Sequence, residues 1–362
     1  MLGFFYNSLA PDYGKRHLDF VLKPIENNIT KTSINPYLAY YNTPNFTESG
    51  VVQHNSDGYR NSYETPNFRD TDTFRILCIG GSTTYGSGVS DPKLAWPEVL
   101  KSLLNKNPPS QLARKKFEVL NGGLGWGSSA ELLTHYAFKH INYEHDIVIV
   151  HTGGNDVGAL AVNDFKMDYS HWRNFYVSGS SSLRPFEKLV IESSNFAKVF
   201  YSIWFNKIPF QKSNLAISTQ MFKNSPINET QSNLVNNPTV AYRNNIFNLI
   251  TIIKNSGITP IFFQFYQPTF RDLKENNPTA FLNASRQLGD QLLELNESLF
   301  SGRMRLKSEA QKVCETEDII FWEINRDYLP EKYFVDQCHL GTEGQVEKAR
   351  FVYSNILNFF NE

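Results

Sequence analysis

The chain has 362 residues, of which 41% are hydrophobic and 14% aromatic, enough to bury a large core without disulfide or metal support. Lysine and arginine number 35 against 36 acidic residues, so a formal charge of −1 provides no basic surface of the kind that binds nucleic acid. No apolar run approaches the roughly 20 residues that cross a bilayer, so the sequence contains no transmembrane segment.

Residues 1–72 are polar and show little periodicity. Four prolines interrupt them, at Pro24, Pro36, Pro44 and Pro66. We expect an N-terminal extension packed on the main domain, with a turn at residues 54–60. The start of the chain lacks the basic and long apolar stretches of a signal peptide, which favours a cytoplasmic location for the chain as given. Oligomeric state is left open.

From residue 73 onward, short apolar runs alternate with helical patterns. The runs predict five strands, and apolar residues at helical spacing predict four helices between and after them. A capping box, Ser128 with Glu131, marks the start of the second helix. The alternation predicts an α/β domain over residues 73–362, with a five-stranded parallel sheet and helices on both faces. The predicted strands cover residues 75–79, 117–120, 147–150, 261–265 and 319–322, and the helices cover 96–104, 128–136, 246–253 and 346–360.

Residues 160–238 do not fit the alternation. They are first rich in aromatic residues and then in asparagine, serine and glutamine. We interpret them as an insertion after the third strand. The sequence leaves open whether they form a substrate-covering lid or a satellite core.

The cysteines and histidines show no metal-binding pattern. Cys78, Cys314 and Cys338 form no C-x-x-C pair, so neither a zinc cluster nor a disulfide framework is expected, while a single disulfide is left open. Beside His339, Cys338 is interpreted as a small apolar filler rather than a thiol nucleophile. The remaining histidines lack metal-ligand spacing, so we expect no metal and no cofactor: His54, His135, His140 and His145.

Polar and glycine-rich stretches follow three of the predicted strands and precede the last helix. In parallel sheets, ligands bind beyond the carboxyl ends of the strands, so these stretches are expected to meet. The first, by itself, resembles a loop that cradles phosphate, but it matches neither a Walker loop nor a dinucleotide fingerprint. Ser82 alone is equally explained as a turn serine. The stretches are residues 80–86, 121–128, 151–156 and 336–340.

Taken together, the four stretches contain the parts of a nucleophilic site. A serine hydroxyl needs a base to take its proton, and a histidine oriented by a carboxylate is the usual base. Asp336 and His339 are three residues apart, so one turn can hold both. The side-chain amide of Asn155 and a backbone amide beside a glycine are suited to binding an oxyanion. By contrast, Asp156 and His151 are expected to have structural roles.

These four stretches, in this order, resemble the conserved blocks of the SGNH/GDSL hydrolase superfamily, over residues 74–160 and 240–360. The resemblance implies a flavodoxin-like three-layer α/β/α sandwich. It also implies catalytic residues Ser82, Asp336 and His339, and an oxyanion hole formed by Ser82, Gly125 and Asn155. Two departures are Gly-Gly-Ser-Thr in place of Gly-Asp-Ser-Leu, and a glycine-rich second block in which Gly123 and Gly127 compete with Gly125.

The resemblance implies a serine esterase that hydrolyses a carboxylic ester through an acyl-Ser82 intermediate. The substrate is expected to be a small-molecule or glycan ester, with an O-acetyl or short acyl group on a carbohydrate favoured. Two alternatives stay open: an O-acyltransferase that passes the acyl group to a sugar hydroxyl, and a non-catalytic carbohydrate-binding module.

Overall fold

Five parallel strands form the central sheet in the computed structural model, which describes residues 31–35, 37–172, 189–191, 193–207, 226–288 and 292–361. The strand order is β6-β5-β7-β8-β9. The first strand of this sheet along the chain, β5, therefore lies inside it, with β6 on one side and β7, β8 and β9 on the other. This is the flavodoxin-like order, and it confirms the predicted parallel sheet. The strands are β5 (Thr73–Gly80), β6 (Lys116–Gly123), β7 (Ile147–His151), β8 (Thr259–Phe265) and β9 (Ile320–Ile324).

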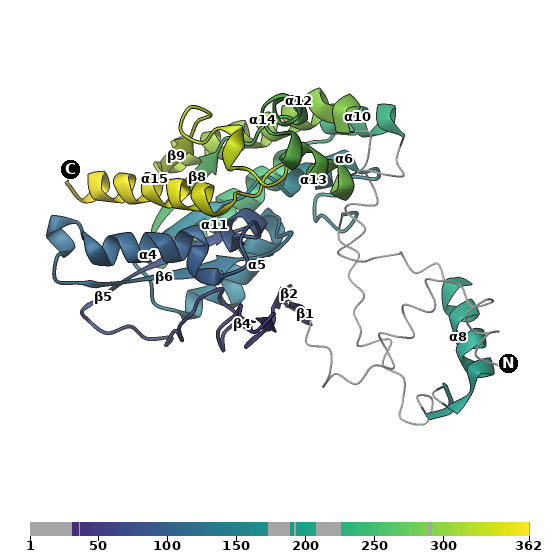
Figure 1. Cartoon of the computed structure of the whole chain (residues 1–362), viewed down its shortest axis with the longest axis horizontal. Coiled ribbons are helices and arrows are strands. Elements are labelled where there is room, and N and C mark those ends of the chain that lie inside the picture. The colour runs from purple at the N-terminus through teal and green to yellow at the C-terminus, as the bar shows by residue number, and fades with distance from the viewer. Residues whose placement is uncertain are drawn as a thin grey trace.

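Helices cover both faces of this sheet (Figure 1). Ile76 and Cys78 of β5 pack with α4 (Trp96–Lys106) and α15 (Thr342–Asn361). The alternate residues of β5, Leu77 and Ile79, pack on the other face with α5 (Ser129–Phe138), α11 (Val240–Asn255) and α14 (Leu292–Glu317). Because successive side chains of a strand point to opposite faces, one apolar run fills two cores. The three-layer α/β/α prediction is confirmed.

The remaining elements are short or lie in the parts of the chain for which no regular structure was predicted. Two antiparallel pairs precede the sheet, and Leu234 of α10 packs in the same core as α11 and α14. Residues 173–188, 192 and 208–225 of the predicted insertion lie outside the described residues. The other elements are β1 (Thr32–Asn35), β2 (Ala39–Asn42), β3 (Thr47–Glu48), β4 (Val51–Val52), α3 (Ser82–Tyr85), α6 (Asp156–Ala161), α8 (Asn195–Lys207), α10 (Ile227–Asn236), α12 (Phe270–Asn276), α13 (Pro278–Leu288), and the 3-10 helices η2 (Pro92–Leu94), η3 (Ser110–Leu112), η4 (His140–Asn142) and η6 (Glu331–Tyr333).

The segment before β5 covers the free edge of β6. Asn61 donates from Nδ2 to the carbonyl of Val119 at 2.9 Å and accepts from the amide of Asn121 at 2.9 Å. The amide of Arg60 donates to the carbonyl of Asn121 at 3.0 Å. These bonds satisfy backbone groups that an open edge strand would expose. The prediction for residues 1–30 and 36 lies outside the described residues.

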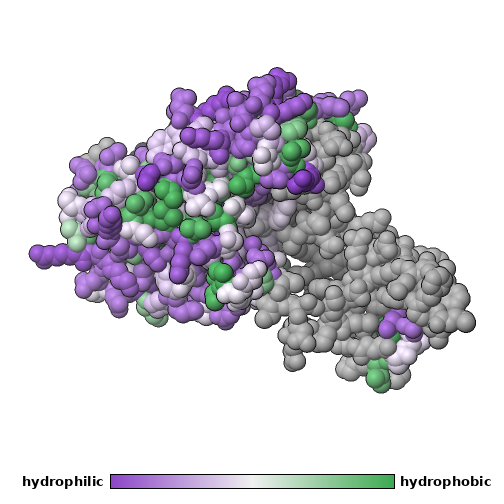
Figure 2. Space-filling model, viewed as in Figure 1, coloured by the Kyte–Doolittle hydropathy of each residue, from purple (hydrophilic) through white to green (hydrophobic). Residues whose placement is uncertain are grey.

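Polar residues dominate the face of the molecule shown in Figure 2, and apolar residues gather between α4 and α15 on that face. In the part of the chain that the structure describes, no helix is both long and apolar enough to cross a membrane.

Five buried histidines predict that the fold loses stability in acid. Burial lowers the pKa of all five below the usual 6.5: to about 4 for His54, His135 and His145, to about 3 for His151, and well below 6.5 for His140. Unfolding restores ordinary values, so the unfolded chain takes up protons first and stability falls as pH drops from 6.5 toward 4. Each such group costs about 2 kcal/mol at pH 5.

Urea unfolding followed at pH 8, 6.5 and 5 would measure this loss. The variant His145→Gln removes one of the five groups, so the decrease in unfolding free energy between pH 8 and pH 5 should shrink by about 2 kcal/mol. An unfolding free energy that stays constant from pH 8 to pH 5 would contradict the prediction.

Candidate active site

Ser82 is the first residue of α3, directly after β5, at the point where the strand order of the sheet reverses. The two preceding residues are glycines, and a side chain at either position would crowd its neighbours. A Cβ atom on Gly80 would lie 2.2 Å from Thr84 Oγ1 and 2.5 Å from the carbonyl oxygen of His151. A Cβ atom on Gly81 would lie 2.8 Å from Asn155 Nδ2. Their role is therefore close approach, which brings the end of β7 and the Asn155 side chain up to the serine.

Arg60 holds the turn that follows Ser82. Its buried guanidinium donates to the carbonyls of Tyr85, Gly86 and Val89, at 2.7, 2.6 and 2.7 Å, and lies 4.2 Å from the centre of the Tyr85 ring. Charge-assisted hydrogen bonds of this kind are stronger than neutral ones. The Asp57-Gly58-Tyr59-Arg60 stretch, predicted as a turn in the extension, thus supports the serine from outside the sheet.

The loop between η6 and α15 brings a histidine to the serine. His339 Nε2 lies 2.7 Å from Ser82 Oγ, across 257 residues of sequence. On its other side, His339 Nδ1 lies 2.7 Å from Asp336 Oδ2. Asp336 Oδ1 accepts the backbone amides of His339 and Cys338, at 2.9 and 3.0 Å, so one short turn fixes the carboxylate. The sequence-predicted trio therefore forms one continuous chain of hydrogen bonds.

The pKa values of Asp336 and His339 are shifted in opposite directions. Burial alone would raise the pKa of Asp336, but hydrogen bonds from His339 and Cys338 together with the His339 charge lower it. Burial alone would lower the pKa of His339, but Cys338 and the Asp336 carboxylate beside it raise the value well above 6.5. Asp336 therefore stays ionised, and it stabilises positive charge on the imidazole.

Asn155 is the residue before α6, and its Nδ2 donates to the carbonyl of Gly127 at 2.9 Å. Because Nδ2 would also crowd a Cβ on Gly81, the amide lies against the backbone next to Ser82. Among the described residues, the backbone amides of Ser82 and Gly125 find no acceptor.

The three glycines of the second block have different surroundings. Gly123 packs against α3, since a Cβ there would lie 2.1 Å from the amide nitrogen of Tyr85. Gly127 and its neighbour Trp126, which has a φ of 65°, line the pocket. Gly125 is not among the lining residues, and its carbonyl accepts from the Tyr40 hydroxyl at 2.8 Å. The choice among them as oxyanion donor stays a prediction.

His151 and Asp156 both have structural partners, and His151 also lines the pocket. His151 Nδ1 lies 2.8 Å from the carbonyl oxygen of Phe263, and its ring stacks on Phe265 at 4.9 Å. The buried Asp156 carboxylate accepts from the amide and hydroxyl of Ser129, at 3.1 and 2.6 Å. It thereby joins the start of α5 to that of α6.

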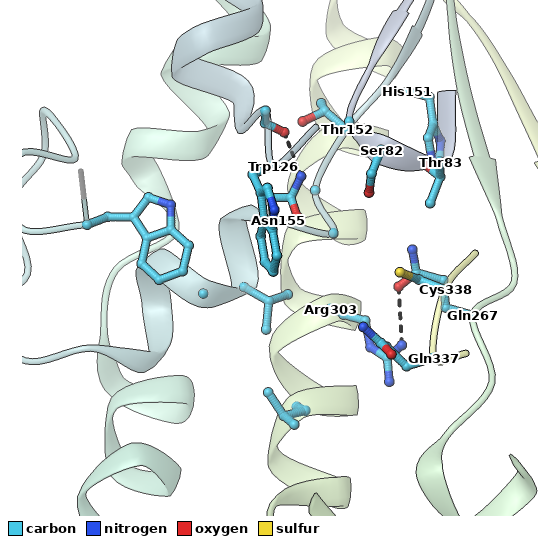
Figure 3. Close-up of a pocket in the computed structure, with 18 of the residues that line it drawn as sticks. Ser82, Thr83, Trp126, His151, Thr152, Asn155, Gln267, Arg303, Gln337 and Cys338 are labelled. Atoms are coloured by element: carbon cyan, nitrogen blue, oxygen red, sulfur yellow. Dashed lines mark hydrogen bonds between the residues drawn. The ribbon is translucent and has the colours of Figure 1, made fainter. Parts of the chain in front are cut away.

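An open pocket leads to Ser82, and Figure 3 shows the Ser82 hydroxyl directed into it. Asn155 and Trp126 lie on one side, Cys338 and Gln267 on the other, and Arg303 faces the serine across the cavity. The apolar part of the lining consists of Trp126, Val157, Trp172, Phe270 and Leu299. Sequence reasoning missed Gln267, Arg303 and Gln337, because a single polar residue on a helix or loop carries no spacing signal.

All three cysteines are free, which settles the open question of a disulfide. Cys338 Sγ lies 3.7 Å from His339 Nδ1. Ligand atoms of Asp336, Cys338 and His339 lie within 4.8 Å of one another, and in the described residues this is the one such group able to hold a metal ion. A metal there would displace the proton between Asp336 and His339, so it would compete with the hydrogen-bonded chain.

Comparison with known proteins gives structural similarity alone. No protein-family model matches the sequence, and no curated protein does. A carbohydrate acetylesterase from Sinorhizobium meliloti is 10% identical, with 79% of this chain and 100% of that chain covered at a TM-score of 0.40. An acetyl xylan esterase is 11% identical, with 78% of this chain and 100% of that chain covered at a TM-score of 0.41. A lipase/acylhydrolase from Enterococcus faecalis is 12% identical, with 79% of this chain and 97% of that chain covered at a TM-score of 0.41.

Proposed function

We propose that the protein is an ester hydrolase that uses Ser82 as its nucleophile. The observation that carries the proposal is the hydrogen-bonded chain from Ser82 Oγ through His339 to Asp336 at the mouth of an open pocket. Each of the two distances is 2.7 Å, which is within the range for direct proton transfer.

In the first step, Ser82 Oγ attacks the ester carbonyl carbon while its proton passes to His339 Nε2. A tetrahedral intermediate forms with negative charge on the former carbonyl oxygen. Its collapse breaks the bond to the alcohol oxygen, which takes the proton from His339 and leaves. Water then attacks the acyl-Ser82 carbonyl with His339 again as base, and releases the carboxylic acid and free serine. Asp336 orients the imidazole and stabilises its protonated form.

The negative oxygen of the intermediate needs donors that are already in place. Asn155 Nδ2 and the backbone amide of Ser82 are the proposed donors, because one lies against Gly81 and the other has no acceptor among the described residues. Gly125, whose amide is likewise without a described acceptor, is the proposed third donor. Removal of one such donor typically costs about 2.7–4 kcal/mol of activation free energy.

For the substrate, we propose an O-acetyl or short acyl ester of a carbohydrate. Trp126 lines the pocket and is 37% exposed, so it supplies a flat apolar surface on which a sugar ring can stack, while the buried Trp172 packs against Gly158 in the pocket wall. Their neighbours Val157 and Leu299 leave the same wall apolar.

Covalent labelling tests the assignment of the nucleophile. A fluorophosphonate probe should add one adduct to the intact protein, and peptide mass spectrometry should place it on Ser82. Ser82→Ala should abolish labelling, whereas Ser87→Ala, an exposed serine in the same turn, should leave it unchanged. Labelling that persists in Ser82→Ala would overturn the proposal.

A further inference from the structure

The pocket contains a cation that the proposed hydrolysis does not use. Arg303 projects from α14 and faces Ser82 across the cavity (Figure 3). It also lines an adjoining pocket that runs over the ends of β8 and β9, and the two pockets share Gln267 and the end of β7. The guanidinium therefore stands where a substrate that reaches Ser82 would continue.

Arg303 has few partners. Its Nη1 donates to Gln267 Oε1 at 3.2 Å, and its other two nitrogens have no acceptor among the described residues. Burial lowers the pKa of Arg303, an effect opposed by Cys338, Tyr266 and Asp272, but a guanidinium keeps its charge in a protein. A partly buried charge without a counter-ion is unfavourable unless something else compensates it.

The other cations at the adjoining pocket are paired. Lys307 forms an ion pair with Glu323. Arg326 lies 2.7 Å from Glu331 and 3.4 Å from Asp272. Within the described ranges, Arg303 has no carboxylate at ion-pair distance, which sets it apart from both neighbours.

We propose that Arg303 binds a carboxylate on the substrate, so that the preferred substrate is an ester of an acidic sugar or another hydroxy acid. The inference rests on the proposed function and names its substrate class. The flat fork of a guanidinium matches a carboxylate through two parallel hydrogen bonds, and the two free nitrogens of Arg303 supply them.

A pair of substrates that differ only in charge tests the proposal. Hydrolysis of 4-acetoxybenzoate is compared with that of its methyl ester, with release of the phenol as the readout. Arg303→Met should lower kcat/KM for the carboxylate about tenfold or more, while the neutral ester keeps its rate within a few-fold. Lys312→Met removes a charge from the exposed side of the same helix and should change neither. Equal effects of Arg303→Met on both substrates would overturn the proposal.

Binding without turnover separates this proposal from the hydrolase assignment. In the Ser82→Ala protein, titration calorimetry should show D-glucuronate binding at least several-fold more tightly than its methyl ester. Arg303→Gln in the same background should remove the preference while leaving the melting temperature close to that of the parent. If the preference is present and Ser82→Ala still hydrolyses esters, only the nucleophile assignment fails. If the preference is absent, the anion site fails.

Discussion

Ser82→Ala is expected to lower kcat for 4-nitrophenyl acetate by about 10⁴- to 10⁶-fold, to the level left by the oxyanion donors and binding alone. The reason is that Ser82 Oγ is the hydroxyl that His339 Nε2 meets among the described residues, at 2.7 Å. A loss of one oxygen atom at a half-exposed position should leave folding intact, so the melting temperature should stay close to that of the wild type.

The matched control is Ser87→Ala, five residues further along and exposed. Its rate should equal that of the wild type. Comparable steady-state rates for Ser82→Ala and the wild type would exclude Ser82 as the nucleophile, whatever the effect of other substitutions.

Asp336→Asn is expected to lower kcat about 10⁴-fold and to move the pH dependence of the residual activity. His339 must be neutral to accept the serine proton, and its pKa is raised well above 6.5 by Cys338 and Asp336, against the effect of burial. In the wild type, kcat/KM should therefore rise with pH through a value above 6.5 and fall away in acid. Removing the carboxylate charge should shift this rise to lower pH.

Rates measured from pH 5 to pH 10 on one neutral ester give both the loss of kcat and the shift of the pH profile. Asp318→Asn is a suitable control, because Asp318 is exposed and its positive φ of 54° is a conformation that asparagine adopts readily. An unshifted pH profile in Asp336→Asn would mean that Asp336 does not set the basicity of His339.

Much of the fold could be predicted from sequence because the strands are buried on both faces. The run from Arg75 to Ile79 fills two cores with alternate residues, and such a run is visible without any structure. The capping box of Ser128 and Glu131 could also be predicted, because both of its hydrogen bonds join residues close in the sequence. By contrast, the sequence did not predict α12 to α14. These helices carry mixed polar and charged residues, and Gly302 interrupts the pattern of α14.

The candidate site divides in the same way. The approach of Ser82 to His339 could be expected because the ends of parallel strands share one edge of the sheet, and that edge is fixed by topology. Arg303 could not, because nothing in the sequence distinguishes it from other arginines on exposed helices. Only the structure distinguishes Arg303, because it shows that the side chain lines a cavity and has no carboxylate at ion-pair distance among the described residues.

The bonds that Arg60 makes to the turn after Ser82 have a consequence for where the boundary of the folded unit lies. The alternating α/β unit begins at β5, yet three carbonyls of the serine turn are satisfied by a side chain that precedes it. The edge of β6 is covered by the same stretch. The structural support of Ser82 therefore extends beyond the sheet and its helices, and a boundary drawn at residue 73 would separate Ser82 from the side chain that holds its turn.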